Sequence, residues 1–193
     1  MAQLFEPTPS SLTTLINTPK TILITGGSSG IGLATATLVS QLSPNHNLIL
    51  LDVQPPPASF SHSSSRTLFY QCTVTDWKAQ RAGFEAGYQK FGRIDAVFVN
   101  AGISEYKDQF FNDALDAEGK LAEPDRRVLN IDMDGAADTT KLAIHYLRKN
   151  KEGGQIVITA SLAGYLASAG APLYSAAKHG KLTSQMQLQE KNR

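Results

Sequence analysis

The chain has 193 residues, of which 41% are hydrophobic, and this is enough for one globular domain with a buried core. Its formal net charge of +1 argues against a surface dedicated to nucleic acid, and no apolar run is long enough to span a membrane, so we expect neither partner. Cys72 is the single cysteine, and the residues before Lys20 lack a basic start followed by an apolar run. These features exclude an internal disulfide and predict a cytoplasmic protein. The four scattered histidines show no metal-ligand spacing, so we expect no metal site.

Residues 1–19 contain three prolines and several serines and threonines, which predict an N-terminal arm ahead of one domain over 20–193. The domain opens with a short apolar run, Ile22 to Ile24, that is typical of a buried parallel strand. A turn rich in glycine follows, and the apolar spacing then becomes helical from Ile31 to Leu42. The start of the domain therefore predicts a strand, a glycine turn and a helix.

This order of elements can form a phosphate cradle. The glycines of the turn, Gly26, Gly27, Gly30 and Gly32, let the backbone approach an anion closely. The helix N-terminus presents unpaired N–H groups and the positive end of the helix dipole. The same pattern also fits a tight turn with no ligand. Residues later in the chain are needed to distinguish a phosphate-binding turn from a turn without a ligand.

Strands and helices alternate along the rest of the chain. The expected strands after the first cover 47–53, 67–70, 94–99 and 155–160, and the later helices begin near Asp76, Pro124 and Leu173. Alternation of this kind, with apolar strands throughout, predicts an α/β fold in which helices cover both faces of a parallel sheet. Right-handed crossovers place the first strand at the centre, with ligands at the carboxyl ends of the strands.

Asp52 lies at the end of the second expected strand, about 20 residues after the last glycine of the turn. A carboxylate at this position can accept a hydrogen bond from the ribose 2′-hydroxyl of an adenine dinucleotide. It would also repel a 2′-phosphate, so Asp52 favours NAD over NADP. A plain turn-capping aspartate is the alternative.

Tyr174 and Lys178 are four residues apart at the start of the last expected helix, so their side chains share one face. An ammonium group beside a phenol stabilises the phenolate and brings it closer to acid–base chemistry. A lone Tyr-x-x-x-Lys also occurs by chance. Ser161, however, follows the fifth expected strand at the edge where ligands bind, and its hydroxyl could hold a substrate oxygen.

Four motifs taken together resemble the short-chain dehydrogenase/reductase family. They are Thr25-Gly26-x-x-x-Gly30-x-Gly32, Asn100-Ala101-Gly102, Ser161 and Tyr174-x-x-x-Lys178, in the family's order and spacing. The resemblance implies a doubly wound fold of Rossmann type. It also implies NAD-dependent hydride transfer between the cofactor and a small-molecule alcohol or ketone, with a secondary alcohol favoured.

The resemblance also implies roles for individual residues. Tyr174 would act as acid and base on the substrate oxygen, Ser161 would orient that oxygen, and Lys178 would bind the nicotinamide ribose and favour the phenolate. The implied cofactor-binding residues are Gly26, Ser29, Gly30, Ile31, Gly32, Asp52, Thr73, Val74, Asn100, Ala101, Gly102, Tyr174 and Lys178.

Three departures from the family pattern bear on activity. Asp132 occupies the position of an asparagine that takes part in a proton relay, and its charge could hold the Lys178 ammonium. Thr73 occupies the position of an aspartate near the adenine. The family's last strands are expected to be missing after Arg193, which would leave Ile156 to Ile158 as an unpaired strand edge.

These departures leave a second reading open. A working enzyme is one reading, and the other is a truncated, catalytically impaired relative that binds NAD or acts as an interaction protein. An incomplete gene sequence would also account for the missing strands. Family members often pair through the two long helices, here 124–149 and from 173 onward, so the resemblance allows a homo-oligomer.

Overall fold

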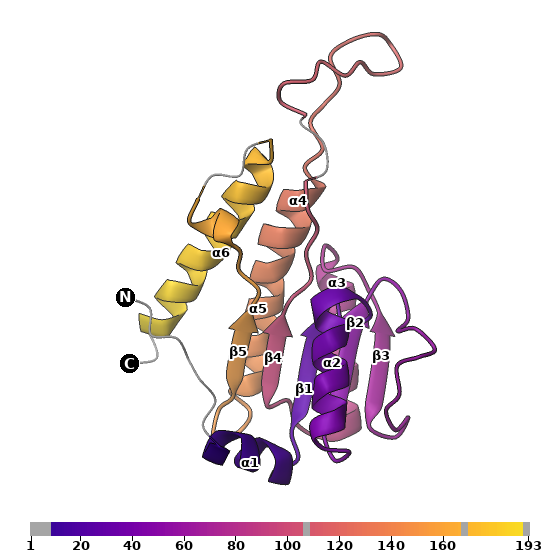
Figure 1. The fold of residues 1–193 in the computed structure, drawn as a ribbon, viewed down its shortest axis with the longest axis vertical. Coiled ribbons are helices and arrows are strands. Elements are labelled where there is room, and N and C mark those ends of the chain that lie inside the picture. Colours follow the sequence, from indigo (N-terminus) through magenta and orange to yellow (C-terminus); the bar gives the residue numbers. More distant parts are fainter. Residues whose placement is uncertain (1–8, 106–108, 167–169, 191–193) are drawn as a thin grey trace.

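The protein is described by a computed structural model that covers residues 9–105, 109–166 and 170–190. Its centre is a parallel sheet of five strands in the order β3-β2-β1-β4-β5 (Figure 1). The strands are β1 Thr21–Thr25, β2 Asn47–Asp52, β3 Thr67–Gln71, β4 Ala96–Val99 and β5 Gln155–Ile158. The predicted α/β fold with the first strand at the centre is therefore confirmed.

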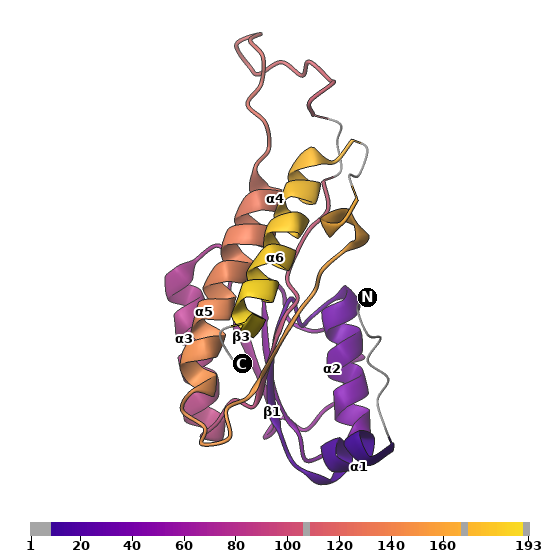
Figure 2. The ribbon, with the colours of Figure 1, turned by 90° about the vertical axis from the view of Figure 1, so that its left-hand side faces the viewer.

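Helices cover both faces of this sheet, as expected for a doubly wound fold. Figure 2 shows α2 on one face, and α3 and α5 on the other. The helical elements are α1 Pro9–Asn17, α2 Gly30–Leu42, α3 Trp77–Phe91, α4 Arg127–Leu129, the π-helical turn η1 Asn130–Asp134, α5 Gly135–Leu147, the 3₁₀ turn η2 Leu162–Gly164 and α6 Pro172–Glu190. The helix α6 runs beside α4 and η1 rather than over the sheet (Figures 1 and 2).

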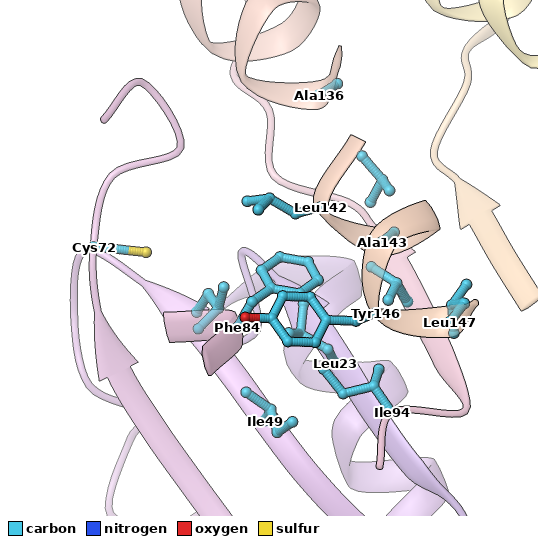
Figure 3. Close-up of a cluster of buried hydrophobic side chains, with 13 residues drawn as sticks. Leu23, Ile49, Cys72, Phe84, Ile94, Ala136, Leu142, Ala143, Tyr146 and Leu147 are labelled. Atoms are coloured by element: carbon cyan, nitrogen blue, oxygen red, sulfur yellow. The ribbon is translucent and has the colours of Figure 1, made fainter. Parts of the chain in front are cut away.

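Alternate residues of the strands supply two apolar cores. Leu48 and Leu50 of β2 point toward α2, whereas Ile49 and Leu51 point toward α3 and α5. The larger core lies on the α3 and α5 side, where Phe84 stacks on Tyr146 with ring centroids 5.5 Å apart (Figure 3). Because β2 is buried on both faces, its side chains are apolar without alternation, as in other parallel sheets.

Two helix starts differ from the sequence-based expectation. The long helix begins at Arg127 instead of Pro124, and the Asp125 carboxylate accepts the Arg127 N–H at 3.0 Å. Within the expected N-terminal arm, residues from Pro9 onward form α1. Proline is well suited to a first helical position, because the N–H it lacks would have no partner there. Residues 1–8 lie outside the described part of the chain.

The strand β5 forms one edge of the sheet. It pairs with β4 on one side, and no strand within the described residues pairs with its other side. This pairing confirms the expected unpaired strand edge for the described part of the chain, and Val157 in this strand is 53% exposed. Among the described helices, none combines the length and apolar character that a bilayer crossing requires.

Candidate active site

A cleft of about 270 Å³ opens at the carboxyl ends of β1 and β4. Four segments meet there: the glycine turn after β1, the loop after β4, the end of β5 and the first turns of α6. The lining residues are Gly26, Ser29, Gly30, Ile31, Asn100, Ala101, Gly102, Ile103, Ser104, Thr159, Tyr174 and Lys178. The parallel topology accounts for this gathering, because it brings the carboxyl ends of all strands to one edge.

The glycine turn requires glycine at Gly26 and Gly32. Gly26 has a positive φ of 66°, and a Cβ at Gly32 would lie 2.0 Å from the Gly26 carbonyl oxygen. The helix α2 begins at Gly30, so its unpaired N–H groups face the cleft. The Ile31 side chain at the cleft is 63% exposed, which is unusual for isoleucine and suits a residue that contacts a ligand.

Asp52 lies beside the glycine turn but is not among the described residues that line the cleft. Its Oδ2 accepts the Ser28 N–H at 2.9 Å and its Oδ1 accepts the Gln54 N–H at 3.2 Å. A carboxylate can accept about four hydrogen bonds, so these two contacts leave room for a ribose hydroxyl. The turn-capping role and the ribose-binding role are therefore compatible.

Thr73 and Val74, the expected adenine contacts, also lie outside the described lining of the cleft. The Thr73 hydroxyl bonds to that of Thr75 at 2.8 Å. Val74 is buried, and its carbonyl accepts a hydrogen bond from the Gln80 side chain at 2.6 Å. Its side chain packs on Gly135, where a Cβ would approach it to 2.8 Å. Val74 thus serves the packing of α3 and α5.

Asn100 ties three strand ends together. Its Nδ2 donates to the Thr25 carbonyl at 3.2 Å, and its Oδ1 accepts from the Thr159 hydroxyl at 3.0 Å. The backbone N–H groups of Asn100 and Ala101 both donate to the Thr25 hydroxyl, at 3.0 and 3.2 Å. These bonds fix the loop after β4 against the glycine turn and so shape the cleft.

Tyr174 and Lys178 lie on one face of α6 and both line the cleft, as their spacing predicted. The Lys178 Nζ lies 5.2 Å from the centroid of the Tyr174 ring, close enough for the ammonium charge to act on the phenol. Lys178 itself is only 4% exposed. The pair can hold and move a proton at the phenol oxygen.

Glu105, which the sequence analysis missed, holds the N-terminus of this helix. Its Oε2 accepts the N–H groups of Leu173 and Tyr174, at 2.9 and 3.0 Å. A carboxylate is favoured there because the first N–H groups of a helix have no partner and carry the positive end of the dipole. The contact spans 69 residues of sequence, so no local pattern predicts it.

Asp132 lies in the π-helical turn η1 and is fully buried. Its Oδ1 accepts the Ile103 N–H at 2.7 Å, and its Oδ2 contacts the Lys178 Nζ at 2.9 Å. A side chain at Gly102 would displace this carboxylate, because a Cβ there would lie 2.7 Å from Oδ2. The expected contact between Asp132 and the Lys178 ammonium is thus present.

Lys181, one turn beyond Lys178, was also missed, although its spacing of three residues was a usable signal. It is 4% exposed, and its Nζ donates to the Ala101 carbonyl at 3.5 Å. Burial, together with the charge of Lys178, lowers the pKa of Lys181 to about 8, while Asp132 acts in the opposite direction. Of these two lysines, Lys178 forms the ion pair with the buried Asp132 carboxylate.

Ser161 follows β5, and its hydroxyl accepts the Ala163 N–H at 3.1 Å as the cap of η2. The described lining of the cleft includes Thr159 from the same segment but not Ser161. The structure therefore brings Tyr174, Lys178 and the glycine turn together, whereas Ser161, Asp52, Thr73 and Val74 lie outside the lining.

Comparisons with known proteins agree with this arrangement. A family model described as short chain dehydrogenase matches residues 20–193. A curated relative, the short-chain dehydrogenase/reductase prx4 of Penicillium roqueforti, is 37% identical over 161 residues, which are 83% of this chain and 46% of the relative. The short-chain dehydrogenase/reductase ascJ of Acremonium egyptiacum is 39% identical over 166 residues, which are 84% of this chain and 54% of the relative.

Among solved structures, the NADPH-dependent 3-quinuclidinone reductase of Rhodotorula rubra superposes with a TM-score of 0.75 at 20% identity, over 98% of this chain and 71% of that one. At this identity the likeness concerns the fold alone. The chain spans about half the length of the curated relatives it matches, 46% and 54% of the two named above.

Proposed function

This chain belongs to the short-chain dehydrogenase/reductase family, and we propose that it uses NAD to interconvert an alcohol, preferably a secondary one, and a ketone by hydride transfer. The observation that carries the proposal is that Tyr174 and Lys178 line the same cleft as the glycine turn. This arrangement supports acid–base chemistry next to a dinucleotide-binding turn.

The residues present fit a dinucleotide. The open space where a Cβ would lie at Gly30, together with the N-terminus of α2, suits the pyrophosphate. Asp52 would accept a hydrogen bond from the adenosine ribose and repel a 2′-phosphate, and this favours NAD. Lys178 would bind the nicotinamide ribose. When bound, the nicotinamide supplies or accepts the hydride.

Tyr174 would hold the substrate oxygen and exchange a proton with it. In alcohol oxidation the phenolate takes the hydroxyl proton, and in ketone reduction the phenol donates it. The Lys178 ammonium lies 5.2 Å from the centroid of the Tyr174 ring. Ser161 would orient the substrate oxygen from the segment after β5, and Asp132 would hold Lys178 in place.

Two observations support a second candidate, an NAD-binding relative that turns over poorly. The 2.9 Å contact between Asp132 and Lys178 holds the ammonium in the interior, and the Ser161 hydroxyl is engaged at η2. The first contact would offset the charge that Lys178 presents to Tyr174, and the second occupies one acceptor site of the Ser161 hydroxyl. A cytoplasmic location and a homo-oligomer through the long helices stay predictions of the family resemblance.

Two measurements separate these candidates. Calorimetric titration with NAD and with NADP should show tighter binding of NAD. Asp52→Asn should reduce the difference in affinity between the two cofactors. Oxidation of a panel of secondary alcohols should produce NADH at rates above those of Tyr174→Phe. Binding of NAD with no NADH above the Tyr174→Phe level would refute the enzyme proposal and support the second candidate. Preference for NADP in the unchanged chain would refute the cofactor assignment.

A further inference from the structure

The helix α6, which bears Tyr174, begins without a capping side chain of its own. Ala171 lies in the N-cap position, since its carbonyl accepts the Ser175 N–H at 3.0 Å, and an alanine side chain has no oxygen that could cap a helix. Pro172, the first residue of the helix, has no N–H. The first N–H groups of α6, those of Leu173 and Tyr174, therefore need an acceptor from elsewhere in the chain.

Glu105 supplies this acceptor, and Gln109 holds Glu105 in place. The Glu105 Oε2 accepts the Leu173 and Tyr174 N–H groups, at 2.9 and 3.0 Å. Its Oε1 accepts a hydrogen bond from the Gln109 Nε2 at 2.7 Å. Hydrogen bonds to a charged acceptor are among the stronger ones in proteins. One carboxylate thus connects the start of α6 to the side-chain amide of Gln109.

The same amide also contacts the segment just before α4. The Gln109 Oε1 accepts the Asp125 N–H at 2.6 Å, and its Nε2 donates to the Asp125 carbonyl at 3.2 Å. Asp125 lies two residues before α4, and its carboxylate accepts the Arg127 N–H at 3.0 Å. These contacts close the base of the loop 110–124, which projects beyond the body of the protein (Figures 1 and 2). Both donors and the oxygen of the Gln109 amide are thereby engaged.

The two helix starts that this amide joins lead to the charged pair at the cleft. From α4 the chain continues into η1, where Asp132 contacts the Lys178 Nζ of α6 at 2.9 Å. The helices α4 and α6 pack side by side (Figures 1 and 2). A shift of one helix start against the other would therefore move both Tyr174 and Lys178 relative to the glycine turn.

We propose that Gln109 is a positioning residue that holds the starts of α4 and α6 together and thereby directs Tyr174 into the cleft. Gln109 is not among the described residues that line the cleft, so it acts through Glu105 and the helix start. The inference rests on the proposed function of Tyr174 as acid and base.

The contacts require a side chain that both donates and accepts hydrogen bonds. In Gln109→Glu both donors are lost, and two carboxylates face each other across the 2.7 Å contact. Gln109→Met keeps a side chain of similar length but removes the amide. In the swapped variant, Glu105→Gln with Gln109→Glu, one amide again faces one carboxylate. Its amide oxygen at position 105 stays available to the N–H groups of α6.

Steady-state oxidation of a secondary alcohol tests the proposal in the unchanged chain, Gln109→Glu, Gln109→Met and the swapped variant. We expect each substitution of Gln109 alone to lower kcat about tenfold, and the swapped variant to recover most of this loss. The Kd of NAD, measured by calorimetry, should change much less than kcat, because the glycine turn is not altered. If Gln109→Glu does not fold, the comparison of Gln109→Met with the swapped variant gives the same test.

Gln89 of α3 provides a matched control. Its Nε2 donates to the Glu85 Oε1 at 3.3 Å, again from a glutamine to a glutamate four residues earlier, and both side chains are exposed. Gln89→Glu creates the same repelling pair on a helix that contributes no residue to the described lining of the cleft. This variant should leave kcat unchanged.

Hydrogen exchange of the Leu173 and Tyr174 amides, followed by NMR, reports the same contacts without any substrate. We expect both amides to exchange about tenfold faster in Gln109→Glu and Gln109→Met, and to slow again in the swapped variant. Unchanged exchange in the Gln109 variants, faster exchange with an unchanged kcat, or a swapped variant that recovers nothing would overturn the proposal. If the unchanged chain oxidises no alcohol, the proposed function fails, whereas the amide exchange still decides whether Gln109 positions the start of α6.

Discussion

Replacing Lys181 with methionine should stabilise the folded chain at neutral pH, and this gain should shrink as the pH rises. The pKa of Lys181 falls from its usual 10.5 to about 8, chiefly because the side chain is buried. The difference of about 2.5 corresponds to about 3 kcal/mol, at about 1.4 kcal/mol for each pH unit. This is the free energy by which the folded state disfavours the protonated amine.

The sign follows from proton binding. Below about pH 8 the amine is protonated in both the folded and the unfolded chain, so the full cost of burial lowers stability. Between about 8 and 10.5 the unfolded chain holds a proton that the folded chain has lost, so stability rises with pH. Methionine has a similar length and no charge, and it removes this dependence.

The assay is urea unfolding at a series of pH values from 7 to 10, for the unchanged chain, Lys181→Met and the exposed control Lys141→Met. We expect the stability advantage of Lys181→Met over the unchanged chain to fall by about 2–3 kcal/mol across this range. The control should show no such trend. An advantage of Lys181→Met that does not change with pH would refute the reasoning, because it would mean that the amine does not titrate in this interval.

Glu105→Ala should cost about 1 kcal/mol of stability and lower turnover, because it leaves the N–H groups of Leu173 and Tyr174 without their acceptor. Glu105→Gln keeps an acceptor oxygen, so it should retain part of the stability and part of the turnover. Thermal unfolding and alcohol oxidation measure the two effects, and equal behaviour of the two variants would argue against the cap. Gly102→Ala should cost about 1–3 kcal/mol, because its Cβ would press on the Asp132 carboxylate, and urea unfolding checks this. Cys72 should resist alkylating reagents in the folded chain and react only on unfolding, since burial raises its pKa to about 11. Fast labelling under native conditions would contradict this.

Much of the fold could be predicted from the sequence because the signals are local. Apolar runs mark all five strands, and Asp76 caps α3 as expected, accepting the N–H groups of Lys78 and Ala79. The π-helical turn η1 could not be predicted in this way. This turn contains Asp132, which is buried and contacts the Ile103 N–H and the Lys178 Nζ, so its formation depends on tertiary contacts.

In the candidate site, too, local patterns predict some residues, whereas long-range contacts place others. The glycine turn and the pair of Tyr174 and Lys178 were predictable, since each is a local spacing and the parallel topology brings them to one edge. Glu105 was not, because its partners lie 68 and 69 residues further along the chain. Lys181 could have been predicted from its spacing of three residues from Lys178, which places both on one face of the helix. Ser161, whose hydroxyl accepts the Ala163 N–H at η2, lies outside the described lining.

The central position of β1 also determines the order in which the chain can assemble. Its pairing with β2 joins residues 26 apart, whereas its contact with the segment before β4 joins residues 74 apart. Closing the longer loop costs about 1 kcal/mol more in chain entropy, so the β1–β2 pair should form first and the β4–β5 half should dock on it. In refolding kinetics, Ile49→Val in β2 should therefore slow folding, while Ile158→Val in β5 should mainly speed unfolding. The half of the sheet that bears Asp52 and the glycine turn would then be the part of the protein that exists earliest.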